Sequence, residues 1–292
     1  MSDRPARRRL IVNGDDFGLA PEVNRGIVRA HRDGILTSTS LMVAAPAVAE
    51  AVELARATPS LAVGLHLVLV QGTPASPEAA RAGLARRGGG FRESAIPAAL
   101  LYFFVPRLRA AVADEIRAQL AAFRATGLRV SHVDGHLNIH LHPVAQRVLA
   151  EVAREFAIPA VRLTRDPLLE NLRFDRRHAF RKTFEGTAFR VLSRIAERRF
   201  APLGIASTTG LYGLHQSGAC DETYLERVLA SLPPGDFELY CHPAEADTLE
   251  LQRLMPGYVH ARELAALTSP RIRAIVADRG IELATYADLA AG

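Results

Sequence analysis

The sequence predicts an α/β protein whose parallel strands form a barrel or a doubly wound sheet. Short apolar runs that favour strands alternate with longer stretches in which apolar residues recur at helical spacing. Strands separated by helices of this length are typical of parallel βαβ units. No internal repeat or low-complexity linker divides the 292 residues. We therefore expect one large domain over residues 1–292.

The expected strands and helices follow one another in order. Residues 37–43 are rich in side chains that favour strands, Pro59 ends the second helix, and Gly127 ends the third. The predicted strands are 9–12, 37–43, 61–67, 130–134, 160–163, 210–213 and 237–242. The predicted helices are 21–34, 47–57, 107–126, 144–156, 223–232, 261–267 and 270–278.

Two stretches interrupt this alternation. Residues 70–106 include three consecutive glycines and an apolar run at 100–105, and we expect a long surface loop or lid there. Residues 166–202 combine five phenylalanines with several arginines, which predicts a helical insertion with one apolar and one basic face. Such a helix either packs on the barrel with its basic face in solvent or touches a membrane surface.

The composition argues against several classes of protein. The net charge is +5, but no block of basic and aromatic residues resembles a nucleic-acid-binding surface. The two cysteines lack paired spacing, which argues against a disulfide framework or a cysteine zinc cage. The longest apolar run falls short of the ~20 residues that span a bilayer. No signal-peptide core follows the arginines at 7–9, so we expect a cytoplasmic protein.

Two adjacent carboxylates, Asp15 and Asp16, lie where the first strand gives way to a loop. Loops at the carboxyl ends of strands carry the chemistry of many α/β proteins. Side chains that leave a strand end can diverge, so one carboxylate could bind a metal while the other faces a water or a substrate. The alternative is a turn that caps the helix beginning near Pro21.

Histidines gather at three predicted strand ends. His66 ends the third strand, and His242 ends the last one. The segment between them contributes four more: His132, His136, His140 and His142. Parallel strands place their carboxyl ends on one face, where distant segments can meet. Imidazole and carboxylate together suit zinc or a similar divalent ion, with some neighbouring histidines orienting the ligands.

With these motifs the chain resembles the YdjC-like (ChbG-type) carbohydrate deacetylases over nearly its whole length. The matching segments are residues 13–18 (Asn-Gly-Asp-Asp-Phe-Gly), 34–40 (Gly-Ile-Leu-Thr-Ser-Thr-Ser), 64–66 (Gly-Leu-His), 132–136 (His-Val-Asp-Gly-His) with His140, and 241–243 (Cys-His-Pro). The resemblance implies a distorted TIM-like (β/α) barrel of the glycoside hydrolase/deacetylase type. It also implies a metal-dependent hydrolase that removes the acetyl group from N-acetylated amino sugars.

The resemblance also assigns roles to individual residues. Asp16, His66 and His136 would hold one divalent metal ion, zinc or magnesium. Asp15 would be the general base, and His242 would be a general acid or a substrate contact. No organic cofactor is implied.

Some segments are more similar to the hopanoid-biosynthesis-associated branch of this family, namely 103–107 (Phe-Phe-Val-Pro-Arg), 140–143 (His-Leu-His-Pro) and 210–213 (Gly-Leu-Tyr-Gly). Chitooligosaccharide-type members carry consecutive histidines where Leu137 and Asn138 stand here. The branch implies an N-acetylglucosaminyl hopanoid as the substrate. Such a lipid-linked sugar would be met at the inner face of the membrane, through the 100–105 run and the 166–202 insertion. The same apolar run could instead form a homodimer interface.

Other functions stay open on the same residues. The alternatives are a chitooligosaccharide deacetylase, a metal-dependent phosphoesterase, and a catalytically silent sugar- or lipid-binding protein. The lack of a Gly-rich phosphate loop argues against the phosphoesterase, and the intact Asp15–Asp16 pair argues against a silent protein. The tripeptide at 16–18 matches a kinase motif without the other kinase segments, and no Gly-x-Ser-x-Gly sequence supports a serine hydrolase.

Overall fold

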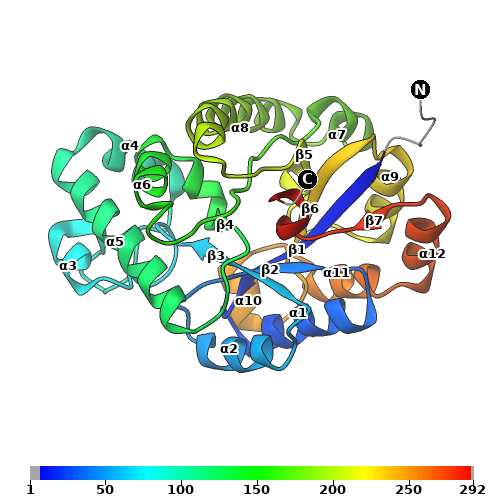
Figure 1. Ribbon diagram of the computed structural model, residues 1–292, viewed down its shortest axis with the longest axis horizontal. Helices are drawn as coiled ribbons and strands as arrows, with labels where there is room; N and C mark the ends of the chain where they lie inside the picture. The colour runs from blue at the N-terminus through cyan, green and yellow to red at the C-terminus, as the bar shows by residue number, and fades with distance from the viewer. Residues whose placement is uncertain (1–6, 291–292) are drawn as a thin grey trace.

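The computed structural model describes residues 7–290, in which helices surround a parallel β-sheet (Figure 1). The domain expected over 1–292 therefore begins and ends outside the described residues. The strands are β1 (Arg8–Phe17), β2 (Ser38–Leu41), β3 (Ala62–Leu67), β4 (Val133–Gly135), β5 (Gly210–Tyr212), β6 (Gly235–Cys241) and β7 (Glu282–Leu283). They are ordered β4-β3-β2-β1-β6-β5, with β7 beside β1, and every pairing is parallel. The predicted α/β class is confirmed.

Residues 160–165 connect the two edges of this sheet. Val161 bridges to Val133 of β4, and Ala160 bridges to Ala206. At the other edge, the N–H of Leu211 in β5 donates to the carbonyl of Arg165 at 3.3 Å. The strand expected at 160–163 is thus reduced to isolated bridges, because β4 offers only three residues to pair with. The described residues give seven strands closed by an irregular segment, not the eight strands of a regular (β/α)₈ barrel.

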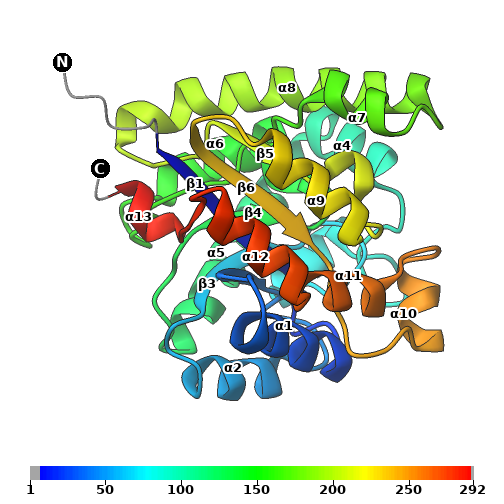
Figure 2. The same cartoon turned by 90° about the vertical axis from the view of Figure 1, so that its right-hand side faces the viewer.

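Helices cover the outside of the sheet. They are α1 (Pro21–Asp33), α2 (Val48–Arg56), α3 (Pro77–Ala79), α4 (Ala95–Phe104), α5 (Pro106–Ala125), α6 (Pro143–Val152), α7 (Leu168–Phe174), α8 (Ala179–Phe200), α9 (Glu222–Ser231), α10 (Leu249–Leu254), α11 (His260–Leu267), α12 (Pro270–Asp278) and α13 (Tyr286–Ala290). Proline stands in the first turn of α1, α5, α6 and α12, where its missing N–H costs no helical hydrogen bond. Figure 2 shows α7 and α8 along one side of the molecule and α1 and α2 on the opposite side.

The stretch 70–106 contains α3, a π-helical turn (Ala80–Leu84) and α4, so it is not a plain loop. Buried polar groups fasten it to the body of the protein. The hydroxyl of Tyr102 donates to the carbonyl of Leu69 at 2.7 Å. In α5, Glu115 accepts the N–H groups of Ala75 and Ser76 at 2.7 and 2.9 Å. The second interrupting stretch, 166–202, holds α7 and α8.

No single helix among residues 7–290 is long and apolar enough to cross a membrane. Helices α4 and α5 are long and apolar enough only when taken together, and the chain bends by 110° between them.

Candidate active site

A bulge near the carboxyl end of β1 directs Asp15 and Asp16 into the protein. Gly14 pairs with Thr39 and Phe17 pairs with Leu41, so β1 takes three steps where β2 takes two. The extra residue is accommodated by Asp16, which has a φ of 66°. A bulge breaks the alternation of side chains along a strand. All of β1 after Arg8 is buried, and Asp15 and Asp16 have 3% and 1% of their residue surfaces exposed.

His66, at the end of β3, faces Asp16 through one ring nitrogen. Its Nε2 lies 3.2 Å from Asp16 Oδ1, and its Nδ1 lies 2.8 Å from Asp134 Oδ1 and 3.1 Å from Ser40 Oγ. Burial opposes a charge on this ring, but the neighbouring carboxylates outweigh burial and raise the pKa of His66 to about 10. At neutral pH this pKa leaves the ring of His66 protonated when no other cation lies beside it.

His136 follows β4 directly and approaches the same oxygen. Its Nδ1 lies 3.0 Å from Asp16 Oδ1, and its Nε2 lies 3.2 Å from the side-chain oxygen of Gln71. The side-chain oxygen of Gln71 thus accepts a hydrogen bond from the Nε2–H of His136, which directs the Nδ1 lone pair at Asp16. The next two residues, Leu137 and Asn138, both have positive φ angles. Such conformations are costly away from glycine, and they cluster at functional sites.

Asp16, His66 and His136 offer ligand atoms within 4.8 Å of one another. Asp16 Oδ2 and His66 Nε2 are buried and lack a hydrogen-bond partner within the described part of the chain. His66 can donate its Nδ1–H to Asp134, and His136 can donate its Nε2–H to Gln71. The lone pairs of the other two ring nitrogens then both point at Asp16 Oδ1. That arrangement repels unless a proton or a cation lies between them. The three residues therefore fit a divalent cation, whose histidine ligands commonly donate their second N–H to an oxygen acceptor.

A second acidic group, formed by Asp15, His66 and Asp134, is also close enough to hold a metal. Arg162 occupies it instead. The guanidinium makes two hydrogen bonds of 2.7 Å to the oxygens of Asp15 and lies 2.8 Å from Asp134 Oδ2. A fixed positive charge at this distance disfavours a second cation. Of the two groups, the one around Asp16 is therefore the one that fits a cation.

Arg162 was not identified from the sequence, although it is the largest fully buried side chain. It also pairs with Glu238 of β6 at 2.7 Å and lies over the ring of Tyr240. Burial opposes its charge, but Asp134 and Asp15 outweigh burial and hold the pKa of Arg162 well above its ordinary value. A single arginine in a weak strand gives no local signal of this role. Only the fold brings its acidic partners around it.

The buried cluster carries more acid than base. Arg162 and His66 are its cations, and they face four carboxyl groups, those of Asp15, Asp16, Asp134 and Glu238. Burial raises the pKa of Glu238, and the hydroxyl of Tyr286 donates to it. Burial also opposes ionisation of Asp16, but His136 and His66 hold its pKa well below the ordinary value. A divalent cation at Asp16 would reduce this excess of negative charge.

His242 follows β6 and lies at the edge of the same group. Its Nε2 is 3.9 Å from Asp16 Oδ2, and its backbone N–H donates to Glu263. Burial lowers the pKa of His242 to about 4, although Asp16 and Asp15 oppose that shift. The imidazole is therefore neutral at neutral pH.

The other histidines of the 131–143 segment have structural contacts. His132 stacks on Tyr286 with ring centroids 4.2 Å apart. His140 Nε2 lies 3.0 Å from the carbonyl of Arg162, and His142 accepts the N–H of Val144 at the start of α6. The structure thus brings Asp15, Asp16, His66, His136 and His242 together. It adds the unpredicted Arg162, Gln71, Ser40 and Glu238.

Comparison with known proteins shows the family of this chain. The model of the YdjC-like protein family matches residues 9–278. The chain belongs to the YdjC-like family. Its relatives include a carbohydrate deacetylase of Brevibacillus brevis, which is 32% identical over 288 residues, covering 96% of this chain and 99% of the relative. A chitooligosaccharide deacetylase of Klebsiella pneumoniae is 33% identical over 296 residues, covering 97% and 99%.

A solved structure has a similar fold. It is a protein of Enterococcus faecalis V583 described as a candidate cellobiose-phosphate cleavage protein. The alignment covers 97% of the YdjC-like chain and 99% of that protein, with a TM-score of 0.74 and 27% sequence identity.

Proposed function

We propose that this YdjC-like protein is a metal-dependent hydrolase that removes the acetyl group from N-acetylated amino sugars. The observation that carries the proposal is the convergence of Asp16, His66 and His136 on one point, with the carboxylate of Asp15 beside them. Relatives that align over almost the whole chain are carbohydrate deacetylases. Asp16, His66 and His136 would hold the ion, zinc or magnesium.

A divalent ion in this site would polarise the acetyl carbonyl and lower the pKa of a bound water. Asp15 takes the proton of the attacking water as the new C–O bond forms and the C–N bond weakens. Arg162 holds both oxygens of Asp15 in place, so this base meets the water in a fixed orientation. The products are acetate and the free amine.

His242 has the second proton-transfer role in this proposal. Because its imidazole is neutral at neutral pH, the proton that it passes to the leaving amine would be the one that Asp15 takes from the water, which returns Asp15 to its carboxylate form. Its Nε2 is the ring nitrogen on the side of Asp16, 3.9 Å from Oδ2, and this atom would contact the substrate.

For the substrate, we propose a lipid-linked sugar of the N-acetylglucosaminyl hopanoid type, met at the inner face of the membrane. Support comes from large apolar side chains exposed on two helices: Ile96, Leu100 and Phe104 of α4, and Phe180 and Phe184 of α8. Arginines accompany them on α8, as in peripheral helices that bind anionic lipid. A chitooligosaccharide is the second candidate, because a relative with that substrate aligns over 97% of the chain.

Acetate release from metal-reconstituted protein tests the proposal, with N-acetylglucosaminyl hopanoid and N,N′-diacetylchitobiose as the two substrates. We expect metal-dependent release that is faster with the lipid-linked sugar and is lost in His136→Ala. His31→Ala changes a histidine of α1, on the side of the molecule opposite α8, and should behave as wild type. Metal-independent release, or full activity in His136→Ala, would contradict the assignment of the site. A preference for chitobiose would overturn the lipid-linked substrate alone.

A further inference from the structure

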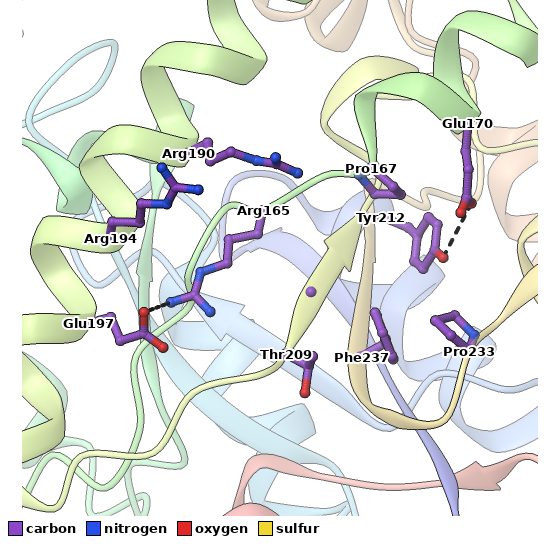
Figure 3. A pocket seen from close by; sticks show the side chains of 11 residues that line it. Arg165, Pro167, Glu170, Arg190, Arg194, Glu197, Thr209, Tyr212, Pro233 and Phe237 are labelled. Carbon is purple, nitrogen blue, oxygen red and sulfur yellow. Dashed lines mark hydrogen bonds and ion pairs between the residues drawn. The ribbon is translucent and has the colours of Figure 1, made fainter. Parts of the chain in front are cut away.

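A cavity of about 310 Å³ opens on the outer face of the sheet (Figure 3). It lies between α8, the start of α7, and strands β5 and β6. Neighbouring residues of a strand point to opposite faces. Glu238 points inward to Arg162, whereas Phe237 lines this cavity. The sheet therefore separates the cavity from the candidate active site.

Three arginines line one wall of the cavity. Arg165 lies 2.7 Å from Glu197, yet its Nε is buried without a hydrogen-bond partner in the described part of the chain. Arg190 and Arg194 are one turn apart on α8, and neither forms an ion pair with another residue of 7–290. Like charges at this spacing disfavour a helix. The wall thus carries positive charge that the protein leaves largely unbalanced.

The opposite wall is mainly apolar. Tyr212, Phe237 and Pro233 face the arginines across the cavity (Figure 3). Gly210 leaves room for the aromatic ring, because a Cβ there would lie 2.8 Å from an atom of Phe237. Two acidic residues line the cavity, Glu197 beside Arg165 and Glu170 on this side. The Tyr212 hydroxyl lies 3.5 Å from the carboxylate of Glu170.

We propose that this cavity binds a small organic phosphate ester. Guanidinium groups bind phosphate in paired, charge-assisted hydrogen bonds. The lining holds three arginines and two glutamates, a net charge of +1, and a phosphate group would bind where Arg190 and Arg194 lie together on α8. The aromatic wall would take the organic part of the ligand, and the volume lies in the range of small-molecule sites. This site is independent of the deacetylase function proposed above.

Isothermal titration of the full chain tests the site, with phenyl phosphate and inorganic phosphate as probes and a chelator present to prevent binding to a metal. We expect saturable binding that is tighter for phenyl phosphate. Arg194→Gln should weaken it about tenfold, the loss typical of a hydrogen-bonded charge pair. Arg198→Gln is the matched control, because it removes the same charge from the next turn of α8 without lining the cavity.

Three results would overturn the proposal. They are no saturable binding of phenyl phosphate, equal weakening by Arg194→Gln and Arg198→Gln, and equal affinity for the two probes. Arg194 is exposed, so its substitution should leave the fold intact, and circular dichroism checks this. Arg190→Gln provides a second variant with the same expected loss.

Discussion

The left-handed conformation of Asp16 decides which side chains can share the site. In a regular strand, Asp15 and Asp16 would point to opposite faces. The bulge between Gly14 and Phe17 changes these directions, within a strand that is buried on both faces. Asp16 then meets two imidazoles, while Asp15 meets Arg162. Two neighbouring carboxylates thereby acquire different environments and can serve different roles.

We expect Asp15→Asn to lower kcat for acetate release by about 10²–10⁴-fold, the usual contribution of a general base. The amide keeps the shape of the side chain but cannot accept the water's proton. Metal content should stay unchanged, because Asp15 is not in the group around Asp16. Asp33→Asn, an exposed change on α1, is the control. Full activity with normal metal content would remove Asp15 from the mechanism.

Arg162→Met should destabilise the protein by about 3–5 kcal/mol, the cost of leaving buried charges without their partner. Asp15, Asp134 and Glu238 would all lose the same cation. Urea unfolding measures the change. The control is Arg154→Met, an exposed change that should stay within about 0.5 kcal/mol of wild type. A similar stability for both variants would mean that the carboxylates are not held by Arg162.

Asp166 joins three parts of the fold: the closing segment at 160–165, helix α7, and the turn after β5. Its carboxylate accepts the side-chain N–H of Asn171 and the backbone N–H groups of Leu214 and His215, the last two at 2.8 and 3.4 Å. Burial raises the pKa of Asp166 to about 7, although these hydrogen bonds oppose the shift. An ionisable group thus lies in the connection that replaces a regular strand.

This pKa predicts a pH dependence of stability. The folded protein holds the Asp166 proton more tightly than the unfolded chain, whose aspartates titrate near 3.9. The stabilising contribution is therefore complete below about pH 4 and is lost as the pH rises through about 7. Asp166→Asn cannot ionise and should not lose this contribution. Between about pH 5 and 8, the free energy of unfolding of the wild type should therefore fall by about 2–3 kcal/mol relative to that of Asp166→Asn. Urea unfolding at both pH values measures this, and parallel pH profiles would refute the shift.

Across the whole molecule, exposed apolar side chains are concentrated on α4, α7 and α8. Phe180, Leu169 and Phe104 have 87%, 73% and 68% of their surfaces exposed. Figure 2 places α4, α7 and α8 on the side away from α1 and α2. The fold thus gathers onto one side two stretches that are far apart in the sequence.

The double variant Phe180→Ser, Phe184→Ser should weaken binding to anionic lipid vesicles more than tenfold. Each phenylalanine that is buried in the lipid contributes about 1.5–3 kcal/mol to binding. Co-sedimentation with vesicles measures the binding. Leu249→Ser is the control, since Leu249 is 80% exposed but belongs to α10, which Figure 2 places well away from α8. Equal effects of the two variants, or no vesicle binding by wild type, would refute the membrane contact.

The sequence alone determined the α/β class, most of the elements, and the segments that reach the site. Apolar periodicity and the turn residues beside it are local properties, so the predictions for β3, α5 and α12 agree with the structure to within about two residues. His66 and His136 were placed at strand ends for the same reason. The resemblance to the YdjC-like deacetylases then named the chemistry, and the family is confirmed.

Only the tertiary structure decided how the side chains meet. The pairs of Arg162 with Asp15 and of His136 with Asp16 join residues 147 and 120 positions apart, and ion pairs at such separations leave no local pattern. Gln71 and Ser40, which orient the two histidines, are ordinary polar residues until the fold places them there. The direction of Asp16 depends on a bulge and a positive φ that the surrounding packing imposes.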